Sequence, residues 1–252
     1  MNRLNTELHR LYLAIDTGDA DTGATPPRLV GRNSRVRALV LGLARPADWS
    51  ALSAVWQGVQ ADLELPAPAI AVAGADGLQL WFSLSQAVAV EQAQTFLQGL
   101  RLRYLGHIAP ARVDAQPRTD ATAPDHVLHA RVVPASLEGT ENWSAFVSSD
   151  LAAVFAEEPW LDLPPGPDAQ AELLSRLASI APADFELALA RLGPTAPTDT
   201  LLPPLKPLPA AGATHGDALH PRRFLMAVMN DPGVTLALRI EAAKALLPYA
   251  DT

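Results

Sequence analysis

The sequence contains no cysteine, which excludes a disulfide framework, a cysteine nucleophile and a cysteine-ligated metal. This absence fits a reducing compartment. No segment approaches the roughly 20 apolar residues that a membrane-spanning helix requires. The first residues, "MNRLNTELHRLYLAIDTGD", lack the apolar core of a secretory signal. We therefore expect a cytoplasmic protein with no membrane partner.

Lysine is nearly absent, occurring only at positions 206 and 244. Neither lysine follows a glycine-rich loop, so the chain has no phosphate-binding P-loop. It also has no His-Glu-x-x-His, Gly-x-Ser-x-Gly or Gly-x-Gly-x-x-Gly sequence. We therefore predict no P-loop nucleotide binding, no zinc-protease or serine-hydrolase chemistry of these types, and no dinucleotide or other cofactor.

Charge is unevenly distributed around a formal net charge of −8 and a pI near 5.2, which argue against a general nucleic-acid coat protein. Residues 134–200 contain eleven acids and only two arginines. Residues 28–45 contain no acid and five arginines: Arg28, Arg32, Arg35, Arg37 and Arg45. This basic segment could contact phosphate groups. The alternative is an ordinary solvated strand edge.

The order of elements predicts the fold class. After an opening helix over residues 2–14, apolar patterning predicts two consecutive strand–helix–strand units. The predicted elements are a strand at 36–43, a helix beginning after Asp48, strands at 69–73 and 78–84, a helix at 88–104 and a strand at 126–133. This order is typical of an α+β fold with an RRM-like split βαβ core, an antiparallel sheet that carries both helices on one face.

Composition divides the chain into five predicted parts. Residues 1–34 form an N-terminal helix and mobile linker, residues 35–160 the α+β domain, and residues 161–192 a helical extension. Residues 193–220 are a proline-rich linker, and residues 221–252 a helical hairpin able to dock a partner.

Alternation along "LQLWFSL" assigns its side chains to two faces. Leu78, Leu80, Phe82 and Leu84 form an apolar set that must face the helices. Gln79, Trp81 and Ser83 then lie on the other face, where an aromatic ring could stack on a base. The alternative is that a later segment, such as "NWSAFV", covers this face and packs on Trp81.

Histidines and acids give no clear metal site. His126 and His129 lie three residues apart, so on a strand they point to opposite sides. A site there would need Asp114, Asp120 or Asp125 to converge on them. We predict no metal site.

The turn "AGADGLQLWFSL", the order of elements and the later "ARVVPAS" together resemble the archaeo-eukaryotic primase superfamily, particularly the primase-polymerases of plasmids, phages and mobile elements. The resemblance covers about residues 35–146. It implies an RRM-like domain whose first strand carries an Asp-x-Asp metal pair. It also implies a Ser-Gly-x-x-Gly-x-His turn and strand that contacts the nucleotide, and a later strand that adds an acid or a basic residue.

Matched residue by residue, the resemblance implies a degenerate active site. The turn glycines match at Gly74 and Gly77, whereas the family serine falls on Ala73 and its histidine on Gln79. The metal-binding aspartates fall on Gly42 and Ala44, and Arg131 matches an arginine found before a proline in some members. Without two metals the phosphoryl transfer has no charge neutralisation.

Two functions from different classes follow. The first is a non-catalytic, primase-like protein of a bacterial mobile element or phage, which binds single-stranded nucleic acid or a replication partner through the sheet face and the basic segment. The second is a protein–protein adaptor that docks a partner through residues 221–252. A third possibility is an active nucleotidyl transferase that uses other acids.

Overall fold

The computed structural model describes residues 2–14, 28–31, 33–46, 48–119 and 126–193. Contacts divide the chain into two units, residues 1–198 and 199–252, and every described residue belongs to the first. The predicted hairpin at 221–252 and all but the first residue of the predicted linker at 193–220 lie outside the described residues. Among the described helices, none combines the length and the hydropathy needed to cross a membrane.

The described elements combine five α-helices with seven short or long strands. The helices are α1 (Arg3–Leu11), α2 (Trp49–Ala61), α3 (Val90–Tyr104), α4 (Pro167–Ser175) and α5 (Pro182–Leu192). The strands are β1 (Arg35–Leu43), β2 (Ala69–Val72), β3 (Leu78–Ala89), β4 (Val113–Gln116), β5 (Arg118–Thr119), β6 (Val127–Leu128) and β7 (Ala145–Val147). Single 3₁₀ turns occupy Gly74–Asp76, Pro110–Arg112 and Ala152–Phe155.

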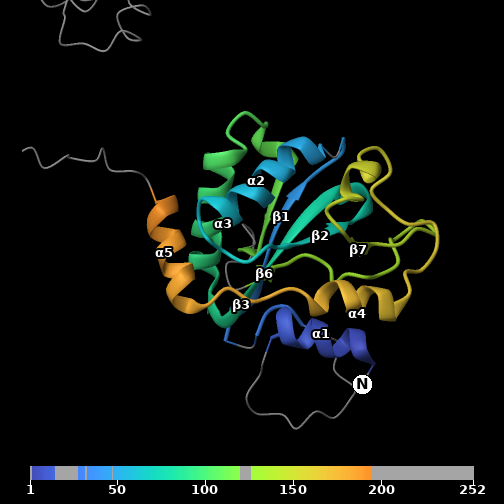
Figure 1. The fold of residues 1–252 in the computed structure, drawn as a ribbon, viewed down its shortest axis with the longest axis horizontal. Helices are drawn as coiled ribbons and strands as arrows, with labels where there is room; N and C mark the ends of the chain where they lie inside the picture. Colours follow the sequence, from blue (N-terminus) through green and yellow to red (C-terminus); the bar gives the residue numbers. More distant parts are fainter. Residues whose placement is uncertain (1, 15–27, 32, 47, 120–125, 194–252) are drawn as a thin grey trace, which may run out of the picture. The chain divides into compact units, whose positions relative to one another are not determined.

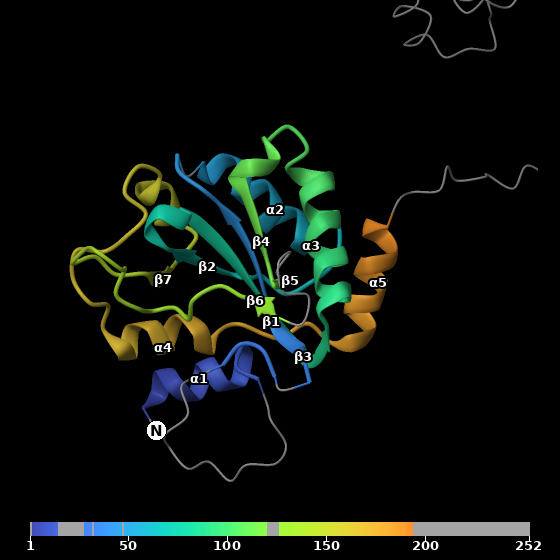
Figure 2. The ribbon, with the colours of Figure 1, turned by 180° about the vertical axis from the view of Figure 1, so that it is seen from behind.

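Five strands form one sheet in the order β4-β1-β3-β2-β7, and each neighbouring pair is antiparallel (Figures 1 and 2). A separate ladder joins β5 and β6. The predicted α+β class with an antiparallel sheet is therefore confirmed.

The first face of the sheet packs against α2, α3 and α5. Leu39, Leu41 and Leu43 of β1 point into this layer with the predicted apolar set of β3. The predicted cap of α2 is also present, since the Asp48 side chain accepts a hydrogen bond from the Ala51 N–H at 3.3 Å. Phe96 of α3 contacts both Phe82 of the sheet and Phe185 of α5, so all three layers share one core.

The second face of the sheet is covered by α1 and α4. Leu4, Leu8 and Leu11 of α1 pack with Ala171 and Leu174 of α4 in one buried cluster that also contains Trp81. These helices also contact each other (Figure 1). The prediction that this face could be covered is confirmed. The segment suggested as the cover instead adds strand β7 to the sheet, and its Phe146 packs on Trp81.

Side chains of the sheet cap the C-terminal end of α1. The last carbonyl groups of a helix accept no hydrogen bond from within the helix and need other donors. The Arg37 guanidinium donates to the carbonyl oxygens of His9 at 3.3 Å and Arg10 at 2.7 Å. The Ser83 hydroxyl donates to Leu11 O at 2.7 Å. A positive charge also suits this end of the helix dipole. These contacts fix α1 against the sheet.

The edge strand β7 is closed by a side chain. Gln170 of α4 accepts from Phe146 N at 2.8 Å and donates to Phe146 O at 2.9 Å. The buried amide thus occupies both backbone groups where another strand would pair.

The prediction of the fourth strand was wrong. Residues 113–116, not 126–133, pair with β1. Within 126–133 only Val127 and Leu128 form a strand, and they pair with β5. Residues 1–34 and 161–192 were predicted as parts outside the α+β domain. In the structure, α1, α4 and α5 pack in the same core layers as residues 35–160.

Candidate functional site

A single row of paired residues crosses the second face of the sheet and contains the positions that a primase would use. From edge to edge the row is Asp114, Gly42, Gln79, Ala71 and Phe146, one residue from each strand. We call this set the central row. Its members are cross-strand neighbours, about 5 Å apart in a sheet.

Gly42 and Gln79 lie side by side on neighbouring strands. The resemblance implies the same proximity for the aspartate and the histidine that would stand at these two positions. A Cβ at Gly42 would lie 3.6 Å from Gln79 Cγ and 3.7 Å from the Asp114 Cβ, both ordinary contacts. Ala44 follows two residues later, just beyond the end of β1, where its N–H donates to Arg112 O at 2.9 Å. Of the four replaced positions, Gly42 and Gln79 share the row, Ala44 continues the chain beyond β1, and Ala73 lies in the turn before β3.

Gln79 is already occupied by a structural contact. Its side chain is buried, and its Oε1 accepts a hydrogen bond from the Trp81 indole N–H at 2.9 Å. An amide carries no titratable proton at this position, so it cannot replace a histidine in acid–base chemistry.

The turn before β3 keeps its glycines for reasons of backbone geometry. Gly74 and Gly77 have φ values of +64° and +72°, in a region that side chains with a Cβ rarely adopt. A Cβ at Gly77 would lie 2.1 Å from Leu43 O, inside the end of β1. Ala73 is buried, and its N–H donates to Gly77 O at 3.0 Å. The turn is thus fixed without any polar side chain at the family's serine position.

Charged groups gather where the central row reaches the sheet edge. Partial burial raises the pKa of Asp76, the nearby Asp114 carboxylate raises it further, and Arg131 opposes both. Asp114 accepts from Gln116 Nε2 at 2.6 Å and forms an ion pair with Arg118 at 3.3 Å. The two carboxylates therefore lie close enough to affect each other. Among the described residues, however, no three His, Asp or Glu side chains are placed to bind one metal ion.

Sequence reasoning missed Asp114 as a member of this site. It was considered only as a partner of His126 and His129, because the fourth strand was placed at 126–133. The alternation in "VDAQ" was the available signal, but four half-buried residues before a proline give a weak strand pattern.

The predicted nucleic-acid-binding residues do not form one surface. Arg37 is 6% exposed and Trp81 is 1% exposed, so neither can contact a nucleic acid in this structure. Arg35 and Arg45 flank β1 at opposite ends, roughly 30 Å apart for a strand of this length. Arg28 is exposed, and Arg32 lies outside the described residues.

Two of the exposed arginines have neighbours that explain them locally. The Arg45 guanidinium lies 5.0 Å from the centre of the Trp160 ring. Arg131 forms an ion pair with Glu138. The alternative of an ordinary basic strand edge fits these residues better than a shared phosphate-binding surface.

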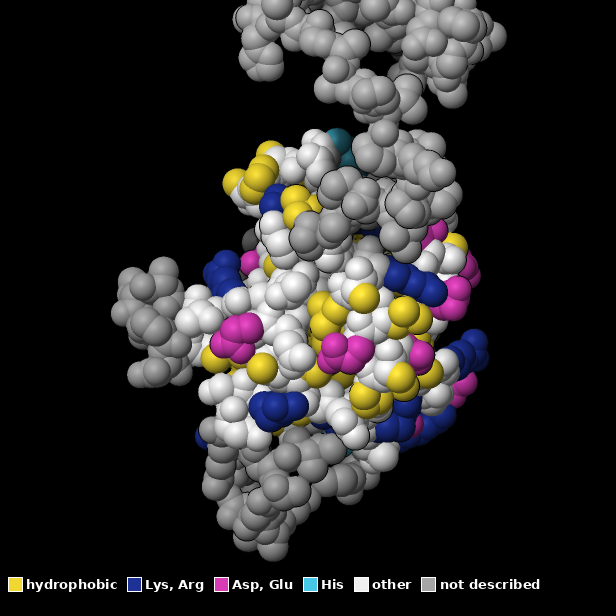
Figure 3. All heavy atoms as spheres, turned by 90° about the vertical axis from the view of Figure 1, so that its left-hand side faces the viewer, with side chains coloured by type: hydrophobic (Ala, Val, Ile, Leu, Met, Phe, Trp, Pro, Cys, Tyr) yellow, Lys and Arg dark blue, Asp and Glu magenta, His cyan; other side chains and the backbone are white. Residues whose placement is uncertain are grey.

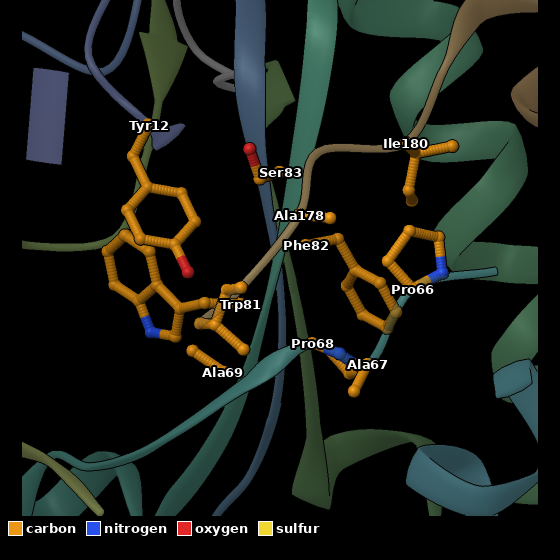
Figure 4. Close-up of a pocket in the computed structure, with 11 residues that line it drawn as sticks. Tyr12, Pro66, Ala67, Pro68, Ala69, Trp81, Phe82, Ser83, Ala178 and Ile180 are labelled. Carbon is orange, nitrogen blue, oxygen red and sulfur yellow. The ribbon is translucent and has the colours of Figure 1, made fainter. Parts of the chain in front are cut away.

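The small space beside Trp81 is a packing interface and not a ligand site. It is lined by Tyr12, Trp81 and the loop at 66–69, and it is too small to hold a water molecule. Figure 4 shows the rings of Tyr12 and Trp81 side by side at this point. Burial raises the pKa of the Tyr12 hydroxyl, so the ring remains neutral.

His126 is exposed, whereas His129 belongs to the structure of the second face. His129 Nε2 donates to Ala38 O at 3.0 Å, and its buried Nδ1 has no hydrogen-bond partner in the described part of the chain. Burial lowers the pKa of His129 below its ordinary value of 6.5, although the bond to Ala38 opposes this effect.

Protonation of His129 should therefore destabilise the fold in acid. Because the folded pKa lies below that of the unfolded chain, the stability contribution is complete above pH 6.5 and declines as the pH falls toward the folded pKa. His129→Gln retains a donor but cannot take up a proton. Urea unfolding at pH 7.5, 6.5 and 5.5 should show a steeper acid loss for the wild type, by up to about 1.4 kcal/mol per pH unit. Parallel curves for the two proteins would contradict this assignment.

No protein-family model matches the chain, and a search of curated proteins finds no significant relative. The resemblance to primases therefore stays a prediction from the sequence.

Proposed function

We propose that this chain is a degenerate, primase-like protein that has no catalytic activity and acts by binding a replication partner of a mobile element or phage. The order strand, helix, strand, strand, helix, strand supports an RRM-like split βαβ core. The partial strand order β4-β1-β3-β2, with α2 and α3 packed on one face, also supports it. The glycine turn supports the relation to primases.

The observation that carries the proposal is the pairing of Gly42 with Gln79 across β1 and β3. The two positions are adjacent, as a nucleotide and metal site would need. One has no side chain, and the other binds the Trp81 indole. Packing contacts, and not groups able to do chemistry, occupy these two positions of the row.

A protein partner fits the structure better than nucleic acid. The second sheet face is covered, Arg37 is buried, and Arg35 and Arg45 lie at opposite ends of β1. The formal net charge of −8 also opposes general binding of a polyanion. Figure 3 shows basic, acidic and hydrophobic side chains interspersed on the α5 side, with no field of a single sign among the coloured residues. Docking through residues 221–252 stays a prediction from the sequence.

Two assays with the full chain test this proposal. Primer synthesis and extension on a single-stranded DNA template with Mg²⁺ or Mn²⁺ should give no product beside an active primase as positive control. Titration with labelled single-stranded DNA at 50 and 200 mM salt should show no specific binding. Primer formation that is lost in Asp114→Asn would instead identify an active transferase. Tight binding that weakens steeply with salt would identify a nucleic-acid-binding protein.

A further inference from the structure

A groove of about 1000 Å³ runs along the outward face of α3. Figure 2 shows α3 between β4 and α5, and the groove follows this helix between its two neighbours. Ala115 and Arg118 line it from the sheet side, and Arg191, Leu192 and Gly193 from the end of α5. It is separate from the central row, whose residues do not line it.

The groove has an apolar floor that water reaches. Leu102 is 62% exposed within it, although large apolar side chains are normally buried. Gly99 lets α5 approach closely, since a Cβ there would lie 2.7 Å from Leu192 Cβ. Leu102, Leu192 and Ala115 thus form an apolar strip that another chain could cover.

Three arginines line the groove and are held by acids that do not line it. Arg103 pairs with Asp62 at 3.2 Å, and Arg118 pairs with Asp114 at 3.3 Å. Arg191 lies 3.6 Å from Glu64 and also donates to Asp62 O at 3.0 Å.

These guanidinium groups are paired but still accessible. The Arg103, Arg118 and Arg191 side chains remain 43%, 56% and 33% exposed. Of the described residues that line the groove, only Glu91 is acidic. Because the arginines are already oriented, a carboxylate would bind them with little further ordering.

We propose that this groove docks an acidic, apolar-anchored segment of a partner protein. This inference rests on the proposed function as a partner-binding protein. Carboxylates of the segment would pair with the arginines, while its aliphatic side chains would cover Leu102 and Leu192. A single-stranded nucleic acid fits less well, because no aromatic side chain among the described lining residues offers a base a stacking surface.

The test is a selection of displayed random 15-residue peptides on the immobilised full chain, followed by anisotropy titrations with the enriched peptides. Enriched sequences should combine Asp or Glu with Leu, Ile or Phe. Leu102→Asp, Arg103→Gln and Arg118→Gln should each weaken their binding by about tenfold. Matched controls away from the groove are Leu151→Asp, which replaces another exposed leucine, and Arg176→Gln, which replaces another exposed paired arginine. Both controls should bind as the wild type does, and thermal melts should show that all variants fold.

The possible failures have different meanings. Enriched peptides that are basic, or that bind the groove variants and the wild type equally, would overturn the groove while leaving a partner-binding function in place. No enrichment at all would remove both. Competition by single-stranded DNA that is lost in Arg103→Gln and Arg118→Gln would assign the groove to nucleic acid, and concentration-dependent self-association lost in the same variants would assign it to a second copy.

Discussion

Trp81→Ala should destabilise the protein by about 3–5 kcal/mol, because it removes the largest fully buried side chain of the second layer. The indole meets Tyr12 edge-on at 5.3 Å and Phe146 edge-on at 5.8 Å. Its neighbours across the sheet include the small Ala69, which cannot fill the space. The variant would also leave Gln79 Oε1 buried without its donor, which adds about 1 kcal/mol or more.

Urea unfolding followed by far-UV circular dichroism measures this loss. Trp81→Phe is the matched control, because it keeps a ring but removes the N–H, and it should cost about 1–3 kcal/mol. This measurement also separates the two interpretations of the sheet face. A tryptophan exposed for base stacking could be replaced at little cost in stability, so a loss below about 1 kcal/mol for Trp81→Ala would refute the closed face.

Local patterns in the sequence were sufficient for much of the first layer. The alternation of Leu78, Leu80 and Phe82 gave the correct face of β3, and Asp48 gave the correct start of α2. These features depend on neighbouring residues only, since strand alternation and a helix cap are local properties. The Gly74–Gly77 turn also belongs here, because its glycines are required by backbone angles within the turn.

The second layer could not be predicted in the same way. Its cover comes from α1 and α4, which are distant from Trp81 in the sequence, so local patterning left two alternatives open. The pairing of Gly42 with Gln79 was not predicted, because alternation along each strand does not fix the register between two strands. Asp114 joins the row only through β4, which the sequence did not locate. Arg37 illustrates the difficulty: a strand arginine among other arginines resembles a surface charge, and only the carbonyl groups of α1 show why it is buried.

Arg37→Met should destabilise the protein by about 3–5 kcal/mol, because it preserves an unbranched side chain but removes every donor. The guanidinium donates to Leu84 O at 3.0 Å in addition to the two carbonyl groups at the end of α1. Each buried acceptor left without a donor costs about 1–3 kcal/mol, and rehydration at the end of α1 offsets part of the total. Arg37→Lys retains the charge, but its single nitrogen cannot reach all these acceptors, so we expect an intermediate loss.

The region that loses stability in Arg37→Met shows whether Arg37 holds α1 against the sheet or serves in nucleic-acid binding. Hydrogen exchange should accelerate first in the amides of α1, and acrylamide should quench Trp81 fluorescence more strongly once α1 separates from the second face. Because four other tryptophans contribute to the signal, the quenching is measured against Trp81→Phe in both backgrounds. An Arg37→Met protein with wild-type stability and unchanged exchange in α1 would show that the guanidinium does not hold the helix. The second face would then be held closed by other contacts, and α1 could separate from it to expose Trp81 to nucleic acid.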